Sequence, residues 1–350
     1  MKTIAKYLFI LLLFPTLALA SDGKKGKYTK EKKINKSYTV SPTATLDVTN
    51  KYGTIYVTTW DQNQTVIEVV IKVSADKEDQ LDKRLNSIDV DFNATPARVS
   101  ALTRIKNFSG KASMEINYTI KVPKKNVLDL TNQYGAILLG KIYGTTKVNV
   151  QYGNFGADEL NGTKNEINLQ YSDVANIDYA ALTRINAQYS KLRVGKAGEE
   201  LILNAEYTDV KIGSARRLNL NASYGDIKVD SAGEVTSNCS YSDVTFGTIS
   251  SMLNLTTTYG DIKVNRITKD AREVYIKGQY SDISLKYDAA HAFDFMAKTM
   301  YADVNGLQNF TIQEKKESGS NNYYKGFYRS GGSARMNIQS EYGEVSMTKL

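Results

Sequence analysis

A tyrosine recurs along most of this chain at an almost constant interval, and this recurrence restricts the fold more than any other feature. From position 134 to position 301 successive copies are 17 to 21 residues apart, and one further copy precedes and one follows this run. A near-constant period of this kind indicates a repeat architecture. The members are Tyr52, Tyr134, Tyr152, Tyr171, Tyr189, Tyr207, Tyr224, Tyr241, Tyr259, Tyr280, Tyr301 and Tyr342.

The stretch Leu218–Val229 shows what one repeat contains. Apolar or small residues occupy every second position up to Tyr224, and Gly225 and Asp226 follow. The alternation then resumes on the other parity, with Ile227 and Val229 apolar. Alternation with a period of two predicts a β-strand with one buried face. The change of parity predicts a corner at which the chain turns and keeps its apolar side chains pointing inward.

The length of the repeat selects among the repeat folds. A propeller blade needs about 40–45 residues, and leucine-rich repeats carry a spacing of leucines that is absent here. We therefore predict an all-β fold, a parallel β-helix (β-solenoid) whose coils have about 18 residues, with strands of successive coils about 4.8 Å apart. Antiparallel hairpins in a sandwich or barrel are the alternative, but hairpins would not give every strand the same sequence.

The chain divides into four parts. Residues 1–20 predict a secretory signal peptide, with Lys2 and Lys6 before an apolar core and Ala18-Leu19-Ala20 as the cleavage site. A lysine-rich flexible tail is expected over 21–37, and the first repeat with a β-rich capping elaboration over 38–127. Within that elaboration, 76–86 is expected to form a short helix. The repeat array is expected over 128–350, with an insertion at about 307–333 that contains a mobile loop.

Net charge indicates little about the folded body. The formal charge is +8, of which +2 comes from Lys2 and Lys6 and +5 from the segment 21–36, with seven lysines against two acids, so the remainder carries about +1. We expect the tail to be solvated, with attraction to an envelope polyanion as a second hypothesis. Nucleic-acid binding is not expected, because the body lacks a basic face. No transmembrane segment is expected after signal cleavage.

The corner residues are predicted to be structural. The tyrosines share the parity of the preceding leucines, so we expect a buried or corner-lining tyrosine ladder. The residue after each tyrosine is small, which indicates a need for small size and not for positive φ. An acid follows, and corner N–H capping together with lysines two positions later is expected to stabilise this column. Binding of a cation or another ligand is the alternative. The acids are Asp173, Asp209, Asp226, Asp243, Asp261, Asp282 and Asp303.

One cluster of aromatic residues falls outside the repeat, in the predicted insertion. Aromatic rings next to cations can stack on a sugar or on a partner protein. The alternative is that these rings close the lower end of the solenoid. The residues are Tyr323, Tyr324, Phe327, Tyr328 and Arg329.

No pattern typical of catalysis or of a cofactor site is present in the sequence. The only histidine, His291, has no partner at the spacing of a metal site or a catalytic triad, and the only cysteine, Cys239, occupies a core position of the repeat. The acids are regular, whereas glycan-cleaving sites need an irregular cluster of carboxylates. We therefore expect no enzyme activity, no metal and no cofactor.

Several of these features together resemble a known group. The predicted signal peptide, Tyr52-Gly53-x-Ile55-x-Val57, the Ile120–Pro123 element and the repeated Tyr-Gly/Ser-Asp-Ile/Val strands are similar to the bacterial putative-adhesin family of exported β-strand-repeat proteins, over roughly 40–350. The resemblance implies a right-handed β-helix and a role at the cell surface or in adhesion. It implies no catalytic residues.

These observations lead to three hypotheses on function. The first is an exported envelope or surface β-solenoid, located in the periplasm, on the outer surface or outside the cell, that binds a cell-surface glycan or an envelope polyanion, for example in adhesion. The second is a periplasmic scaffold with no ligand of its own. The third, which the regular acids disfavour, is a carbohydrate-active β-helix enzyme.

Overall fold

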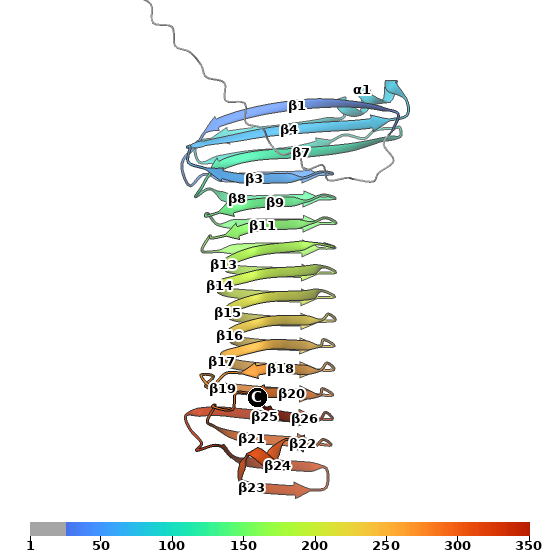
Figure 1. The fold of residues 1–350 in the computed structure, drawn as a ribbon. Helices are drawn as coiled ribbons and strands as arrows, with labels where there is room; N and C mark the ends of the chain where they lie inside the picture. Colours follow the sequence, from blue (N-terminus) through green and yellow to red (C-terminus); the bar gives the residue numbers. More distant parts are fainter. Residues whose placement is uncertain (1–25) are drawn as a thin grey trace, which may run out of the picture.

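The fold is a tall column of β-coils with a wider cap at one end (Figure 1). The computed structural model describes residues 26–350. The predicted signal peptide and the first residues of the predicted lysine-rich tail lie outside this range. Within it, no helix is both long enough and apolar enough to cross a membrane.

Each coil has one strand before its tyrosine and one after it. The first coils use separate strands: β2 (Thr45–Lys51), β3 (Ile55–Trp60), β8 (Val127–Gln133), β9 (Ile137–Ile142), β10 (Thr146–Gln151), β11 (Phe155–Leu160) and β12 (Asn165–Gln170). In the middle, single long strands run from one tyrosine to the next: β13 (Ala175–Gln188), β14 (Lys191–Glu206), β15 (Asp209–Ser223), β16 (Ile227–Ser240) and β17 (Val244–Thr258). Two further coils use β18 (Ile262–Ile267), β19 (Glu273–Gln279), β20 (Ile283–Tyr287), β21 (Phe293–Met300) and β22 (Val304–Asn305).

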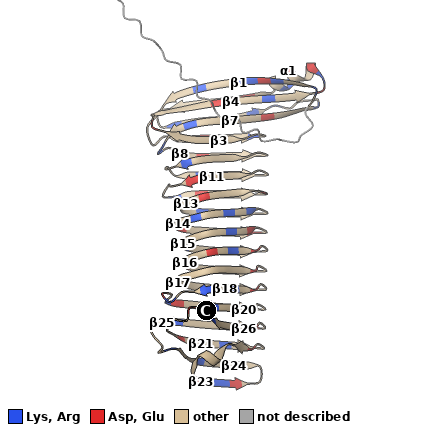
Figure 2. Ribbon diagram, in the orientation of Figure 1, with Lys and Arg blue, Asp and Glu red and all other residues tan. Residues whose placement is uncertain are grey.

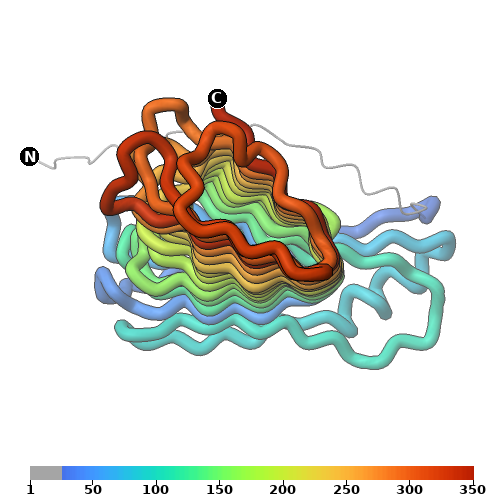
Figure 3. The backbone as a smooth tube through the Cα atoms, turned by 90° about the horizontal axis from the view of Figure 1, so that it is seen from below, coloured from blue at the N-terminus to red at the C-terminus, as the bar shows by residue number. Residues whose placement is uncertain are grey.

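Successive coils pair in parallel and keep equivalent residues above one another. Leu201 pairs with Leu218, and Leu218 pairs with Val235. Seen along the axis, the coils superpose in a single elongated outline (Figure 3). The predicted all-β solenoid is therefore confirmed, and the alternative of antiparallel hairpins is wrong for the column itself.

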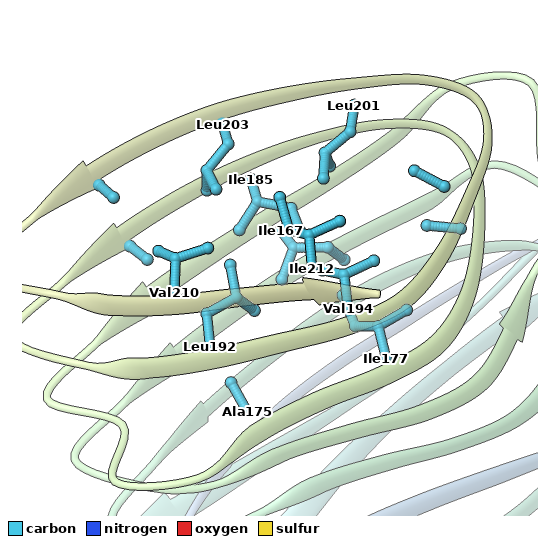
Figure 4. Close-up of a cluster of buried hydrophobic side chains, with 14 of the residues drawn as sticks. Ile167, Ala175, Ile177, Ile185, Leu192, Val194, Leu201, Leu203, Val210 and Ile212 are labelled. Carbon is cyan, nitrogen blue, oxygen red and sulfur yellow. The ribbon is translucent and has the colours of Figure 1, made fainter. Parts of the chain in front are cut away.

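The core fills the narrow space between the two sides of each coil. Leu203 and Ile185 on one side face Val210, Leu192 and Val194 on the other (Figure 4). Each of these side chains is almost completely buried, as the alternation requires. Burial of one such side chain contributes about 1.5–3 kcal/mol relative to exposure. Each coil therefore adds its own buried side chains to the stability of the column.

Residues between the first and second coils form the cap. Its elements are β4 (Gln64–Ala75), α1 (Glu78–Asn86), β5 (Ile88–Thr95), β6 (Arg98–Ile105) and β7 (Ala112–Pro123). Strand β6 lies on β2 and β7 lies on β3, both in parallel. Strand β4 then adds to β7 antiparallel. Helix α1 matches the predicted one, with Leu81 and Leu85 buried.

The lysine-rich segment differs from the flexible tail that the sequence predicts. Residues Tyr28–Thr39 form β1, which pairs antiparallel with β4 along its whole length. The expectation is wrong for this part because β4 offers an open edge, and an edge strand can be rich in lysine when one side of it faces water. Lysines on such an edge also prevent pairing with a second chain.

The other end of the column closes with a hairpin. A 3₁₀ turn, Leu307–Asn309, leads into β23 (Thr311–Ser318) and β24 (Asn321–Tyr328), which pair antiparallel. Strand β24 also pairs with β21. The mobile loop expected within the insertion is therefore wrong, because most of that segment is hydrogen-bonded strand. Charged residues recur on the outermost strands, β1 and β23 (Figure 2).

The last coil is inserted out of chain order. Strand β25 (Ala334–Glu341) pairs in parallel with both β19 and β21. Strand β26 (Val345–Lys349) likewise pairs with both β20 and β22. The chain therefore passes beyond this level, forms the terminal hairpin and returns to fill the gap between two coils that it had already made.

Candidate functional site: the tyrosine corner and the adjoining amide groove

The repeat tyrosines stack on the outside of one corner of the column. Consecutive rings have centroids 4.7–5.3 Å apart and planes within 12° of parallel. All twelve are exposed, from 39% for Tyr52 to 58% for Tyr301. The rings therefore form the predicted ladder at the corner, but the expectation that they point inward and are buried is wrong.

The backbone at the tyrosine explains this outcome. Each of the twelve has a positive φ, between 48° and 61°, which is the left-handed region. The parity argument assumes an extended backbone, and a left-handed residue turns its side chain out of the alternation. This conformation costs roughly 1–2 kcal/mol for a residue with a Cβ. Stacking of about 0.5–1.5 kcal/mol per ring pair offsets that cost.

The small residue after the tyrosine packs against the next coil. A Cβ placed on Gly135 would lie 1.9 Å from the carbonyl oxygen of Gly53. In other coils a buried hydroxyl takes this position. Ser190 Oγ accepts the N–H of Ser172 at 3.1 Å, and Thr208 Oγ1 accepts the N–H of Ser190 at 3.2 Å. Close approach between coils thus explains the small size, and the positive φ belongs to the tyrosine before it.

The acid column caps backbone donors. Asp243 Oδ1 accepts the N–H of Asp261 at 2.9 Å, and Asp282 Oδ1 accepts that of Glu344 at 2.8 Å. The pairs Asp209–Asp226 and Asp261–Asp282 are bonded in the same way. Over residues 26–350 no ion pair joins this column to the neighbouring lysines, so the expected pairing with lysine is wrong. Within the same residues the carboxylates of Asp173, Asp226 and Asp303 accept no hydrogen bond.

The remaining candidates for chemistry lie in packed surroundings. Burial raises the pKa of the Cys239 thiol, as expected for a core cysteine. His291 is buried, its Nε2 lies 2.8 Å from the Ala271 carbonyl oxygen, and desolvation lowers its pKa. In the part of the chain that the structure describes, no three His, Cys, Asp or Glu residues are grouped as a metal site would require.

The aromatic cluster at the lower end is divided between core and surface. Tyr324 and Tyr328 are buried, and the Tyr328 ring packs edge-on against Tyr287 at 5.0 Å. Burial raises the pKa of Tyr324 to about 12. Arg329 donates to the Ala289 carbonyl at 3.0 Å, whereas Tyr323 and Phe327 are partly exposed. These contacts favour the closing role over the ligand-binding role.

Sequence reasoning missed two columns of amide side chains beside the tyrosines. Asn149, Asn168, Asn186 and Asn204 lie three residues before a ladder tyrosine, and their Nδ2–H groups form a chain of bonds from coil to coil, 2.8–2.9 Å long between successive asparagines. A glutamine column lies one residue before the tyrosine, with Nε2 to Oε1 distances of 2.9 Å. The pattern Asn-x-Gln-Tyr, which recurs in three coils, could have revealed both columns from the sequence.

These columns line a surface groove with a volume of about 510 Å³. It extends over the outward sides of β2, β8, β10, β12 and β13, from Lys51 to Gln188. Asn204 and Asn221 continue the asparagine column beyond the groove. Lys51 is the only charged residue in its lining.

One protein family matches almost the whole chain. The family Toastrack DUF4097 matches residues 21–348. The chain belongs to this family. This match confirms the resemblance stated from the sequence. No curated protein matches the chain.

Three solved structures illustrate how distant the similarity is. A "putative adhesin" from Bacteroides fragilis is 13% identical, with 91% of this chain and 97% of that one covered and a TM-score of 0.26. A "putative cell adhesion protein" from Clostridium sporogenes is 9% identical, with coverage of 92% and 100% and a TM-score of 0.20. A "putative lipid binding protein" from Parabacteroides distasonis is 8% identical, with coverage of 92% and 98% and a TM-score of 0.35.

Proposed function

We propose that this Toastrack protein is exported to the cell envelope and acts there as a non-catalytic binding protein, as an adhesin does. The observation that carries this proposal is the tyrosine corner. Twelve aromatic side chains remain exposed along the whole column, and amide columns lie beside them. A purely structural corner could use small polar residues, which tolerate the left-handed conformation better than tyrosine does.

Several further features support the proposal. The names of the three similar structures refer to adhesion or lipid binding, and none of these names refers to an enzyme. The predicted signal peptide supports export. We also propose that the coil is right-handed, because parallel connections of strand to strand almost always have that hand.

The stacking supports one competing function. Ring faces that cover one another are not free to stack on a ligand, so the corner offers ring edges and hydroxyl groups along its length. This arrangement would equally suit a periplasmic scaffold that has no ligand.

Labelling of intact cells separates the two functions. A membrane-impermeant reagent that modifies surface lysines is expected to label this protein, with a periplasmic enzyme as the negative control and an outer-surface protein as the positive control. The adhesion of a deletion strain to host or neighbouring cells is then measured. A protein that is protected from the reagent, in a strain that adheres normally, would contradict the adhesin proposal and favour the scaffold.

A further inference from the structure

The amide groove lies where the asparagine and glutamine columns coincide. It covers five successive coils at the capped end, and at its middle lie Asn149 and Gln151 of β10. After Gln188 the position before the tyrosine holds glutamate, serine or threonine in the next four coils, so the glutamine column ends there, whereas the asparagine column continues to Asn238. The groove is therefore a local feature of the upper half and not a property of every coil.

Each amide in the asparagine column has hydrogen-bonding capacity to spare. Asn149 donates one N–H to Thr131 Oγ1 at 3.3 Å, and its Oδ1 accepts one N–H of Asn168 at 2.9 Å. A primary amide has two donors and two acceptor lone pairs, so one donor and one lone pair of Asn149 are left for a ligand or water. Gln151 likewise keeps one donor and one lone pair, since it accepts from Gln133 and donates to Gln170.

The amides bonded to one another are also held in place. Because each side chain is tied to those of the coils on either side of it, the spare donors and acceptors recur at the strand spacing of about 4.8 Å. A ligand that binds them loses little side-chain entropy of the protein, which favours binding through many weak contacts.

The charge of the groove selects the class of ligand. A polyanion would need several cations along its path, and the lining offers Lys51 alone, at one end. A polycation would need carboxylates, and the lining contains none. A chain of neutral sugars carries hydroxyl groups that both donate and accept, and paired amides satisfy such groups in both directions.

We infer that the amide groove binds an extended neutral polysaccharide, laid parallel to the solenoid axis across β2, β8, β10, β12 and β13. This inference rests on the proposed binding function and assigns it a site and a ligand class. The edges of the neighbouring tyrosine rings border the sugar chain, since each glutamine directly precedes a ladder tyrosine.

The structure offers a matched pair of variants for the test. Asn149→Ala removes an amide at the centre of the groove. Asn204→Ala removes an amide from the same column and breaks the same kind of bond, to Asn186 at 2.8 Å, but lies outside the groove. If the amides only stabilise the column, both variants lose thermal stability and bind a polysaccharide equally well.

Binding of the full chain is measured by affinity electrophoresis and calorimetry with dextran, mannan and galactan, and with dextran sulfate as the polyanion. We expect a neutral polymer to bind and Asn149→Ala to weaken it about tenfold, with Asn204→Ala unchanged. Equal effects of both variants, or no neutral polymer bound, would overturn the inference. Binding of dextran sulfate alone would also overturn it but leave the proposed binding function in place, and cell labelling tests that function separately.

Discussion

Tyr280 stacks on Tyr342 and not on Tyr301, the next tyrosine of the repeat along the chain. The centroids of Tyr280 and Tyr342 are 4.7 Å apart, and Tyr301 lies on the far side of Tyr342 at 4.8 Å. The same order holds for the strands, because β25 separates β19 from β21. The last coil is thus held between two others, and the C-terminal strand β26 is not an edge.

Disulfide cross-linking can test this order. Lys277 and Gln339 are Cα partners on β19 and β25, and Gln339 is also the partner of Lys298 on β21. Neighbouring parallel strands are about 4.8 Å apart, which a disulfide can span, whereas two strand spacings exceed its limit of about 7 Å. In a Cys239→Ser background, Lys277→Cys with Gln339→Cys is expected to cross-link under mild oxidation. Lys277→Cys with Lys298→Cys is the control, and cross-linking of that control pair would contradict the inserted coil.

The sequence was sufficient for the all-β repeat and the aliphatic core positions, because alternation depends on local residues such as Leu201 and Leu218. It could not place Tyr342 between Tyr280 and Tyr301, since identical repeat sequences pair equally well in several orders. It also misplaced the tyrosine rings. The rings point outward because the tyrosine backbone has a left-handed φ. Tyrosine rarely adopts this conformation, so neither the composition nor the alternation of the sequence predicts it.

Substitutions of Tyr207 test the balance between strain and stacking. Tyr207→Ala removes contacts with Tyr189 and Tyr224, at 4.9 and 4.7 Å, and should cost about 1–3 kcal/mol. Tyr207→Gly loses the same contacts but adopts the left-handed conformation freely, so it should be about 1 kcal/mol more stable than Tyr207→Ala. Urea denaturation gives the comparison. Tyr143, exposed and outside the ladder, supplies the control Tyr143→Ala, expected to change stability by less than about 0.5 kcal/mol. An alanine variant more stable than the glycine variant would refute the strain argument.

Two glycines of one coil, Gly135 at the corner before β9 and Gly140 within β9, test the close approach of the coils. An added Cβ at Gly135 would meet the Gly53 carbonyl oxygen at 1.9 Å, whereas at Gly140 the nearest atom, Thr58 Cγ2, is at an ordinary 3.6 Å. Gly135→Ala is therefore expected to destabilise the protein by about 1–3 kcal/mol. Gly140→Ala should be nearly neutral. Thermal denaturation of the two variants measures this difference. Similar melting temperatures would show that the corner can relax around the added methyl group.

The acid column is expected to act through hydrogen bonds and not through a metal ion. Asp243→Ala removes the acceptor of the Asp261 N–H and should cost about 1 kcal/mol. Asp173→Ala is the control, because its carboxylate accepts no hydrogen bond within residues 26–350. Melting temperatures should be the same in calcium and in chelator. Stabilisation of the wild type by calcium, lost in Asp243→Ala, would instead support the cation hypothesis.

Alkaline pH should weaken the junction between the cap and the first coil. Thr103 donates to Asn50 Oδ1 at 2.8 Å, so Tyr118 donates its hydroxyl proton to Thr103 across 2.7 Å. Burial raises the pKa of Tyr118 from 10 to about 12. The unfolded chain therefore releases this proton first as pH rises, and the free energy of unfolding falls between pH 10 and about 12.

This loss amounts to roughly 3 kcal/mol once the pH exceeds both pKa values. Below pH 10 the contribution of Tyr118 is complete, because both states hold the proton. Urea denaturation across this range should show a shallower decline for Tyr118→Phe, which cannot ionise. At neutral pH the variant should lose only about 1 kcal/mol, since Thr103 keeps its bond to Asn50. Parallel declines for the two proteins would mean that Tyr118 ionises equally easily in the folded and unfolded chains.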